Sequence, residues 1–188
     1  NVTPIQQNRG ANALPRELKL FSNNGEVYVS ANVVDEARKL RKQTKELGSV
    51  SVDNANPFVK RGLFAGNDGA FELEADVAPE NSDVVGISLY NDREERTVIY
   101  LDLKQKCIVM DRSESGLTDF GKRAERHDIE KRAEAAGEMK GKLSQDLVVN
   151  YKNDFALGTW APLSLCGAEK RSYHLDIFVD KCSVELFV

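Results

Sequence analysis

The sequence predicts an all-β protein built from short antiparallel strands, and three observations support this fold class. Apolar and polar residues alternate with a period of two in several segments, as in residues 71–77. Polar turn sequences separate these segments at intervals of roughly 8–12 residues. No long stretch with helical spacing dominates the chain. Such a meander of short strands is typical of β-sandwiches and β-barrels.

The first predicted element is a β-hairpin. Residues 17–21 and 26–33 alternate, and the sequence Asn23-Asn24-Gly25 lies between them. Asn and Gly tolerate positive φ, so this cluster predicts a tight turn. Residues 34–46 break the alternation and place apolar residues near helical spacing, which predicts a short helix or turn after the hairpin.

The next predicted strand covers residues 70–77. Its apolar side chains alternate with Glu72, Glu74 and Asp76, which predicts a half-buried strand with a solvated acidic face. The polar segment 91–95 and the pair Asp180-Lys181 then mark turns between further alternating segments. These further predicted strands are residues 83–90, 96–103, 106–111, 173–179 and 182–188.

A charged insertion interrupts the strand pattern at residues 122–142. Acidic and basic residues interleave there, and Ile129, Ala133 and Ala136 form only a thin apolar stripe. We expect a solvated helix over about 122–136 that contributes little to the core. Because the charges are mixed and no aromatic residue offers a stacking platform, a nucleic-acid interface is disfavoured.

Composition narrows the class of protein further. The chain has 188 residues, 41% of them apolar and 30% charged, with a net charge of −4. A chain of this length fits about one domain. Nucleic-acid binders usually carry a positive net charge, and this chain does not. The sequence also has no apolar run long enough for a membrane helix. We therefore expect neither nucleic acid nor a membrane as a partner.

The residues that carry chemistry do not form a known catalytic or metal-binding pattern. The cysteines Cys107, Cys166 and Cys182 have no metal-site spacing, and we expect small buried side chains, with a Cys166–Cys182 disulfide as the alternative. Glu72 and Glu74 lie at a spacing that two-carboxylate glycosidases use. An alternating solvated strand produces that spacing by default, however, and Asp180 and Glu185 fit a turn and a strand in the same way. We expect no catalytic residue, cofactor or metal.

Three stretches, in this order, resemble one known family. Residues 9–20 contain a small-residue run followed by Leu-Pro-Arg-Glu and a strand, residues 111–116 read Asp-Arg-Ser-Glu-Ser-Gly, and residues 175–188 form a Phe-Val-Asp…Ser-Val-Glu-Leu-Phe hairpin. Together they resemble the C-terminal domain of glycoside hydrolase family 32, the invertase, inulinase and levanase family. The resemblance implies an antiparallel β-sandwich of two sheets that packs on a five-bladed catalytic propeller.

The resemblance also implies a role without catalysis. The propeller and its three catalytic motifs are absent from this chain, so residues 1–188 are expected to be a single sandwich domain that buttresses the propeller of a fructan- or sucrose-cleaving enzyme. The alternative is a stand-alone carbohydrate-binding module. The final strands of the family pattern do not follow residue 188, so we expect an incomplete sheet edge and a tendency to self-associate. The family further implies an extracytoplasmic, secreted or periplasmic, location.

Arg16 and Glu17 are the candidate residues for contact with the propeller, since they follow Pro15 at the entry to the first strand. The alternative for this pair is a local ion pair on the surface. Trp160 is the single tryptophan and the candidate for stacking on fructan or sucrose. Its apolar, Pro-containing surroundings also fit an ordinary edge or core residue.

Overall fold

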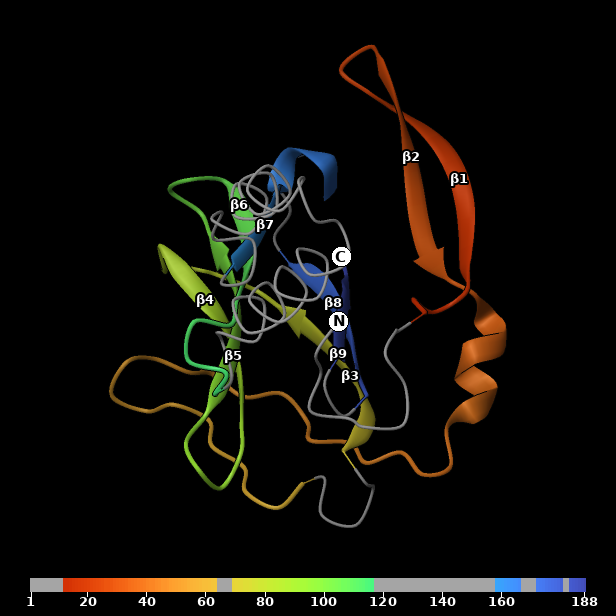
Figure 1. Cartoon of the computed structure of the whole chain (residues 1–188). Helices are drawn as coiled ribbons and strands as arrows, with labels where there is room; N and C mark the ends of the chain where they lie inside the picture. Colours follow the sequence, from red (N-terminus) through yellow and green to blue (C-terminus); the bar gives the residue numbers. More distant parts are fainter. Residues whose placement is uncertain (1–11, 64–68, 117–157, 167–171, 181–182) are drawn as a thin grey trace, which may run out of the picture. The chain divides into compact units, whose positions relative to one another are not determined.

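β-Strands make up nearly all regular structure in the described residues (Figure 1). The computed structural model describes residues 12–63, 69–116, 158–166, 172–180 and 183–188. Five pairs of neighbouring strands in these residues are antiparallel. The predicted all-β, antiparallel fold class is thus confirmed. The charged segment 122–142, expected to be a solvated helix, lies outside the described residues.

The chain divides into two compact units, which are described separately here. The first, called the hairpin unit, comprises residues 11–75 and 174–188. The second, called the meander unit, comprises residues 1–10 and 76–173. Within the described residues, no helix has the length and apolar character that crossing a membrane requires.

The hairpin unit begins with strands β1 (Arg16–Asn23) and β2 (Glu26–Val33), which pair with each other as predicted. Asn24 and Gly25 form the turn with φ values of 51° and 84°. Two successive residues with positive φ suit the twist of a two-residue hairpin, which is why Asn-Gly was a strong signal. The predicted turn or helix after the hairpin is the 3-10 helix η1 (Asp35–Leu40).

A three-stranded sheet completes the hairpin unit. Its order is β3 (Ala70–Val77), β8 (Tyr173–Asp180) and β9 (Ser183–Phe187), so β8 is the central strand. Leu175 and Ile177 of β8 are completely buried. The central strand therefore carries the apolar core on one face, while Asp176 between them projects to the opposite face.

The meander unit contains a four-stranded sheet in the order of the sequence. Its strands are β4 (Val84–Tyr90), β5 (Arg96–Asp102), β6 (Cys107–Asp111) and β7 (Gly158–Pro162), and the short helix η4 (Leu163–Cys166) follows. Ile99 and Leu101 of β5 are completely buried, and Cys107 is a buried thiol as expected. The alternative Cys166–Cys182 disulfide involves Cys182, which lies outside the described residues.

The alternation of apolar and polar residues did not predict strand β7. It has five residues, ends at Pro162 and pairs with β6 at the edge of the sheet. An edge strand tolerates proline because one side of its backbone needs no partner in the ladder. Periodicity over five residues, with a proline at the end, is too weak a signal to identify such a strand.

The Asp111–Gly116 motif forms a tight turn against the start of β5. The carboxylate of Asp111 accepts a hydrogen bond from the Ser113 amide at 2.8 Å, and the Arg96 amide donates to the Glu114 carbonyl at 2.8 Å. Arg96 also forms an ion pair with Glu114 at 2.5 Å. The motif therefore has a structural role in joining the end of β6 to β5.

Gly86 lies where strands β4 and β5 approach too closely for a side chain. A Cβ atom at this position would press on the carbonyl oxygen of Ile99 and lie 2.6 Å from the Tyr100 Cβ. We expect Gly86→Ala to lower the free energy of unfolding by about 1–3 kcal/mol, because the backbone of β5 must shift. Urea unfolding tests this, and Ser88→Ala, at an exposed position on the same strand, serves as the control. Equal midpoints for the two variants would contradict the prediction.

Candidate functional site

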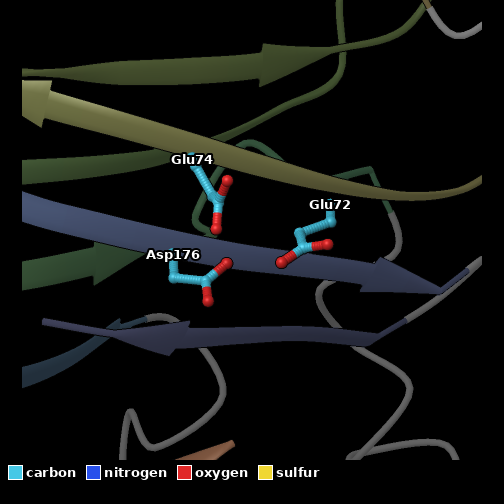
Figure 2. Close-up of side chains that lie close together, drawn as sticks. All are labelled: Glu72, Glu74 and Asp176. Carbon is cyan, nitrogen blue, oxygen red and sulfur yellow. The ribbon is translucent and has the colours of Figure 1, made fainter. Parts of the chain in front are cut away.

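Three carboxylates converge on one face of the sheet in the hairpin unit. Glu72 and Glu74 project from β3, and Asp176 projects from the adjacent strand β8 (Figure 2). One oxygen from each lies within 4.8 Å of the others. Glu72 and Glu74 share a face because they are two residues apart in a strand, and pairing of β3 with β8 adds Asp176.

Two arginines hold this carboxylate cluster. Arg38 of η1 contacts the carboxylates of Glu72, Glu74 and Asp176, with its Nη2 atom 3.3 Å from Asp176 Oδ2. Arg41, directly after η1, forms a two-pronged contact with Glu72: its Nε and Nη2 atoms each lie 2.5 Å from a different carboxylate oxygen. Such fork-to-fork pairs are among the stronger charge-assisted hydrogen bonds. The five side chains fasten η1 to the sheet.

The acidic face of β3 is less solvated than the alternation of its sequence predicted. The side chain of Glu72 is only 13% exposed, and Glu74 is more open at the edge of the cluster. The prediction of a wholly solvated face is therefore wrong for Glu72. The physical reason is tertiary, because the guanidinium groups of Arg38 and Arg41 contact this part of the sheet.

Asp176 is the most unusual member of the cluster. The residue is 4% exposed, and its Oδ1 atom has no hydrogen-bond partner among the described residues. Burial, followed by repulsion from Glu72, raises the pKa of Asp176 to about 6, although Arg38 opposes the shift. For Glu74, burial acts in the same direction, but hydrogen bonds from Arg41 and Arg38 lower its pKa overall.

The geometry favours a structural site over a catalytic or metal site. The carboxylates of Glu72 and Glu74 both accept hydrogen bonds from guanidinium groups, so neither is available as a glycosidase nucleophile or base. Three carboxylates and two guanidinium groups give a formal charge of −3 + 2 = −1. The arginines already supply the positive charge that a divalent cation would bring.

Sequence reasoning weighed Glu72 and Glu74 but missed their partners. Two signals were present in the chain. Arg38 and Arg41 are three residues apart, a spacing that places side chains on one face of a helical turn. Asp176 lies between Leu175 and Ile177, and a carboxylate inside the central hydrophobic strand of a sheet needs a partner when it is buried.

The structure places Arg16 and Glu17 in different local surroundings. Arg16 forms a 2.7 Å ion pair with Glu185 of β9, and its guanidinium lies 5.2 Å from the centre of the Phe187 ring. Glu185 also accepts a hydrogen bond from the Leu14 amide at 2.9 Å. Glu17 forms a local ion pair with Lys19 at 2.8 Å. Arg16 thus joins the first strand to the last, whereas Glu17 pairs with Lys19 of its own strand.

The sugar-binding candidate Trp160 lies in β7, where its backbone is opposite Val109. Its side chain lies outside the described part of the chain. The meander unit also has a polar pocket of about 50 Å³, far below the roughly 300–1,000 Å³ of typical ligand pockets. That pocket is lined by Arg96, Val98, Asp111, Ser113 and Glu114.

Comparison with known proteins identifies the family. Residues 36–188 match the model described as glycosyl hydrolases family 32 C terminal. The chain belongs to glycoside hydrolase family 32. The match includes all five residues of the carboxylate cluster and begins after the β1–β2 hairpin. This confirms the resemblance seen in the sequence.

Two relatives agree with this assignment. The levanase of Bacillus subtilis (strain 168) is 28% identical over 123 residues, which cover 64% of this chain and 18% of that protein. The crystal structure of an exo-inulinase from Aspergillus awamori matches 98% of this chain and 29% of its own, with a TM-score of 0.57 and 17% identity. This family 32 chain therefore shares the fold of part of the inulinase and spans less than a third of either relative.

Proposed function

We propose that this family 32 chain is a non-catalytic domain that supports the catalytic domain of a fructan- or sucrose-cleaving hydrolase. The single observation that carries the proposal is an exposed apolar face on the β1–β2 hairpin. Leu20 and Val29 lie opposite each other across the two strands and are 75% and 60% exposed, and Leu18 and Val27 extend the same face. A contiguous apolar surface of this kind is typical of a contact site.

The exposed part of the apolar face lies toward the turn of the hairpin, and this position supports a docking role. Val33, at the end of β2, is buried, whereas Val27 and Val29, which precede it and lie nearer the turn, are exposed. The uncovered part therefore lies toward the turn of the hairpin. The family match starts at residue 36, so the hairpin lies directly N-terminal to the matched residues. A partner located on the N-terminal side of the domain is the natural occupant of this face.

Arg16 and Glu17 remain candidate interface residues in this proposal. Arg16 shares the face of β1 that carries Leu18 and Leu20, because the three residues are spaced by two. Its side chain is partly exposed even though it pairs with Glu185. A further contact from Arg16 to the catalytic domain would extend the apolar face at its base.

The absence of turnover by this chain alone is part of the same proposal. The sequence contains none of the three catalytic motifs of the family's propeller, and Glu72 and Glu74 are engaged by arginines. Purified chain incubated with sucrose, inulin or levan should release no sugar. The proposal extends to an extracytoplasmic location, which is supported by the family resemblance.

The docking role is tested in the parent enzyme with the double variant Leu20→Asp/Val29→Asp. Each large apolar side chain contributes about 1.5–3 kcal/mol when it is fully buried, so we expect at least a tenfold weaker association between the two domains. Domain dissociation is measured with the catalytic domain and this chain as separate polypeptides. In the isolated chain, the same change should leave the urea midpoint nearly unaltered, since both side chains are exposed.

Val59→Asp is the matched control, because Val59 is an exposed valine outside the hairpin. It should leave the association unchanged. Unaltered binding of the double variant would overturn the docking proposal. So would a chain that sediments as a dimer which the double variant converts to monomer, because a second copy would then cover the hairpin. A parent gene that encodes no family 32 catalytic domain would overturn the functional proposal itself.

A further inference from the structure

We infer that the carboxylate cluster binds a proton, which Asp176 carries and donates to Glu72, and that this shared proton holds helix η1 on the sheet. The two carboxyl groups then form an acid–carboxylate pair instead of two repelling anions. The cluster thereby acts as a latch that tightens in mildly acidic solution. The inference is independent of the docking role of the hairpin.

The first argument is the orphaned oxygen of Asp176. Its Oδ1 atom is buried and has no hydrogen-bond partner among the described residues, while Oδ2 lies 3.3 Å from Arg38 Nη2. Leaving a buried polar atom unsatisfied costs about 1–3 kcal/mol, so buried polar atoms nearly always have partners. A proton on this carboxyl group turns the orphaned acceptor into a donor, and the carboxylate of Glu72 is the adjacent acceptor (Figure 2).

The second argument is the charge around Asp176. From β3 it faces Glu72 and Glu74, and from the η1 side it faces Arg38 directly, with Arg41 bound to both glutamates. The formal charge of these five groups is −1, so one bound proton makes the cluster neutral. Neutrality matters here because a buried charge without a matching partner is costly.

Strand β9, which pairs with β8 on the side away from β3, places no charged residue directly opposite Asp176. On β9, the residue opposite Asp176 is Phe187. Glu185, the acidic residue of the same strand face, is already occupied by the Leu14 amide and by Arg16. The described residues of β9 therefore bring no additional cation to Asp176.

The expected ionisation agrees with this geometry. Burial is the largest cause of the raised pKa of Asp176, to about 6, and the negative charge of Glu72 is the next largest. A carboxyl group whose pKa is higher in the folded chain than in the unfolded chain binds its proton more tightly when folded. Its stabilising contribution is therefore complete below the ordinary pKa of 3.8 and is lost as the pH rises through about 6.

The latch has a defined mechanical consequence within the hairpin unit. Helix η1 begins at Asp35, two residues after the end of β2, so the group that fastens η1 also fixes the base of the hairpin. Protonation of Asp176 removes its repulsion from Glu72 and Glu74, while both glutamates keep their ion pairs with Arg38. In acid below the ordinary range of glutamate, Glu74 also protonates, and its ion pairs with the arginines weaken.

The direct test is a titration of the side-chain carboxyl carbons by nuclear magnetic resonance in the full chain. We expect the Asp176 carboxyl to titrate with a midpoint near 6. A midpoint near 4 or below for Asp176 would overturn the inference. This measurement uses the unmodified chain and does not depend on the folding of any variant.

A second test compares thermal melting of the unmodified chain and Asp176→Asn between pH 7.5 and pH 5. The unmodified chain should gain about 5 °C on acidification, and the variant, whose amide imitates the protonated acid, should lose most of this gain. Asp83→Asn removes an exposed aspartate paired with Lys104 and should keep the full gain. Equal pH profiles for Asp176→Asn and the unmodified chain would contradict the latch.

The same melting experiment separates a proton from a metal ion. Calcium or magnesium chloride at pH 7.5 should give no more stabilisation than sodium chloride of equal ionic strength. A specific rise with either divalent cation, lost in Asp176→Asn, would show that a cation and not a proton satisfies the cluster, and it would overturn the inference.

Discussion

Leu175→Ala should lower the free energy of unfolding by about 3–5 kcal/mol, the largest loss expected from a single substitution in this chain. Leu175 lies in the central strand of the three-stranded sheet and is 0% exposed. Removing three carbon atoms there sacrifices apolar burial and leaves a cavity. Because domains of this size are only marginally stable, the urea midpoint should fall steeply, and it provides the measurement.

Leu20→Ala is the matched control for this prediction. It is the same substitution in a strand of the same unit, but at an exposed position of the hairpin. We expect a change of no more than about 0.5 kcal/mol in the isolated chain. A loss at Leu20 comparable to that at Leu175 would show that the hairpin face is covered in the chain itself, and it would remove the basis of the docking proposal.

The double variant Arg38→Gln/Arg41→Gln should lower the free energy of unfolding by about 2–3 kcal/mol at pH 7.5. Three carboxylates within 4.8 Å of one another then lose both of their cations. Breaking a fully buried pair in this way costs about 3–5 kcal/mol, and the smaller value reflects guanidinium groups that are about a third exposed. Urea unfolding at several pH values measures the loss.

The pH dependence of this loss shows whether charge or packing holds η1 on the sheet. Without the arginines, the pKa values of Glu74 and Asp176 should rise, because both groups lose a nearby cation that favours ionisation. The variant should therefore recover stability as the pH falls toward 5, where protons replace the missing cations. Lys39→Gln, which removes an exposed cation from the same helix, should show neither the loss nor the recovery. A loss that is independent of pH would mean that η1 is held by packing and not by charge.

The strands and the family were within reach of sequence reasoning because their signals are local. Alternation identified β1, β2, β3 and the β8–β9 hairpin within one or two residues, and Asn24-Gly25 identified the first turn. The period of two follows directly from strand geometry, so it survives in the sequence without knowledge of the partners. Three short motifs in family order then indicated glycoside hydrolase family 32.

The carboxylate cluster was beyond sequence reasoning because its members are far apart in the chain. Arg38 and Asp176 are separated by 138 residues, and only the pairing of β8 with β3 brings Asp176 beside Glu72. Sequence alternation described Glu72 as solvated, since it reports which face a residue lies on and not what covers that face. The same limitation applies to Arg16, whose partner Glu185 lies 169 residues away.

The sequence by itself determined the all-β class, the order of most strands and the family, because these depend on local periodicity and on short motifs. Tertiary structure alone decided which faces are covered. It paired the largely buried Glu72 with Arg38 and Arg41, joined Arg16 to the last strand, and left Leu20 and Val29 of the hairpin exposed. The physical reason is that burial and ion pairing arise from contacts between residues distant in the chain, and no local pattern encodes the distance between them.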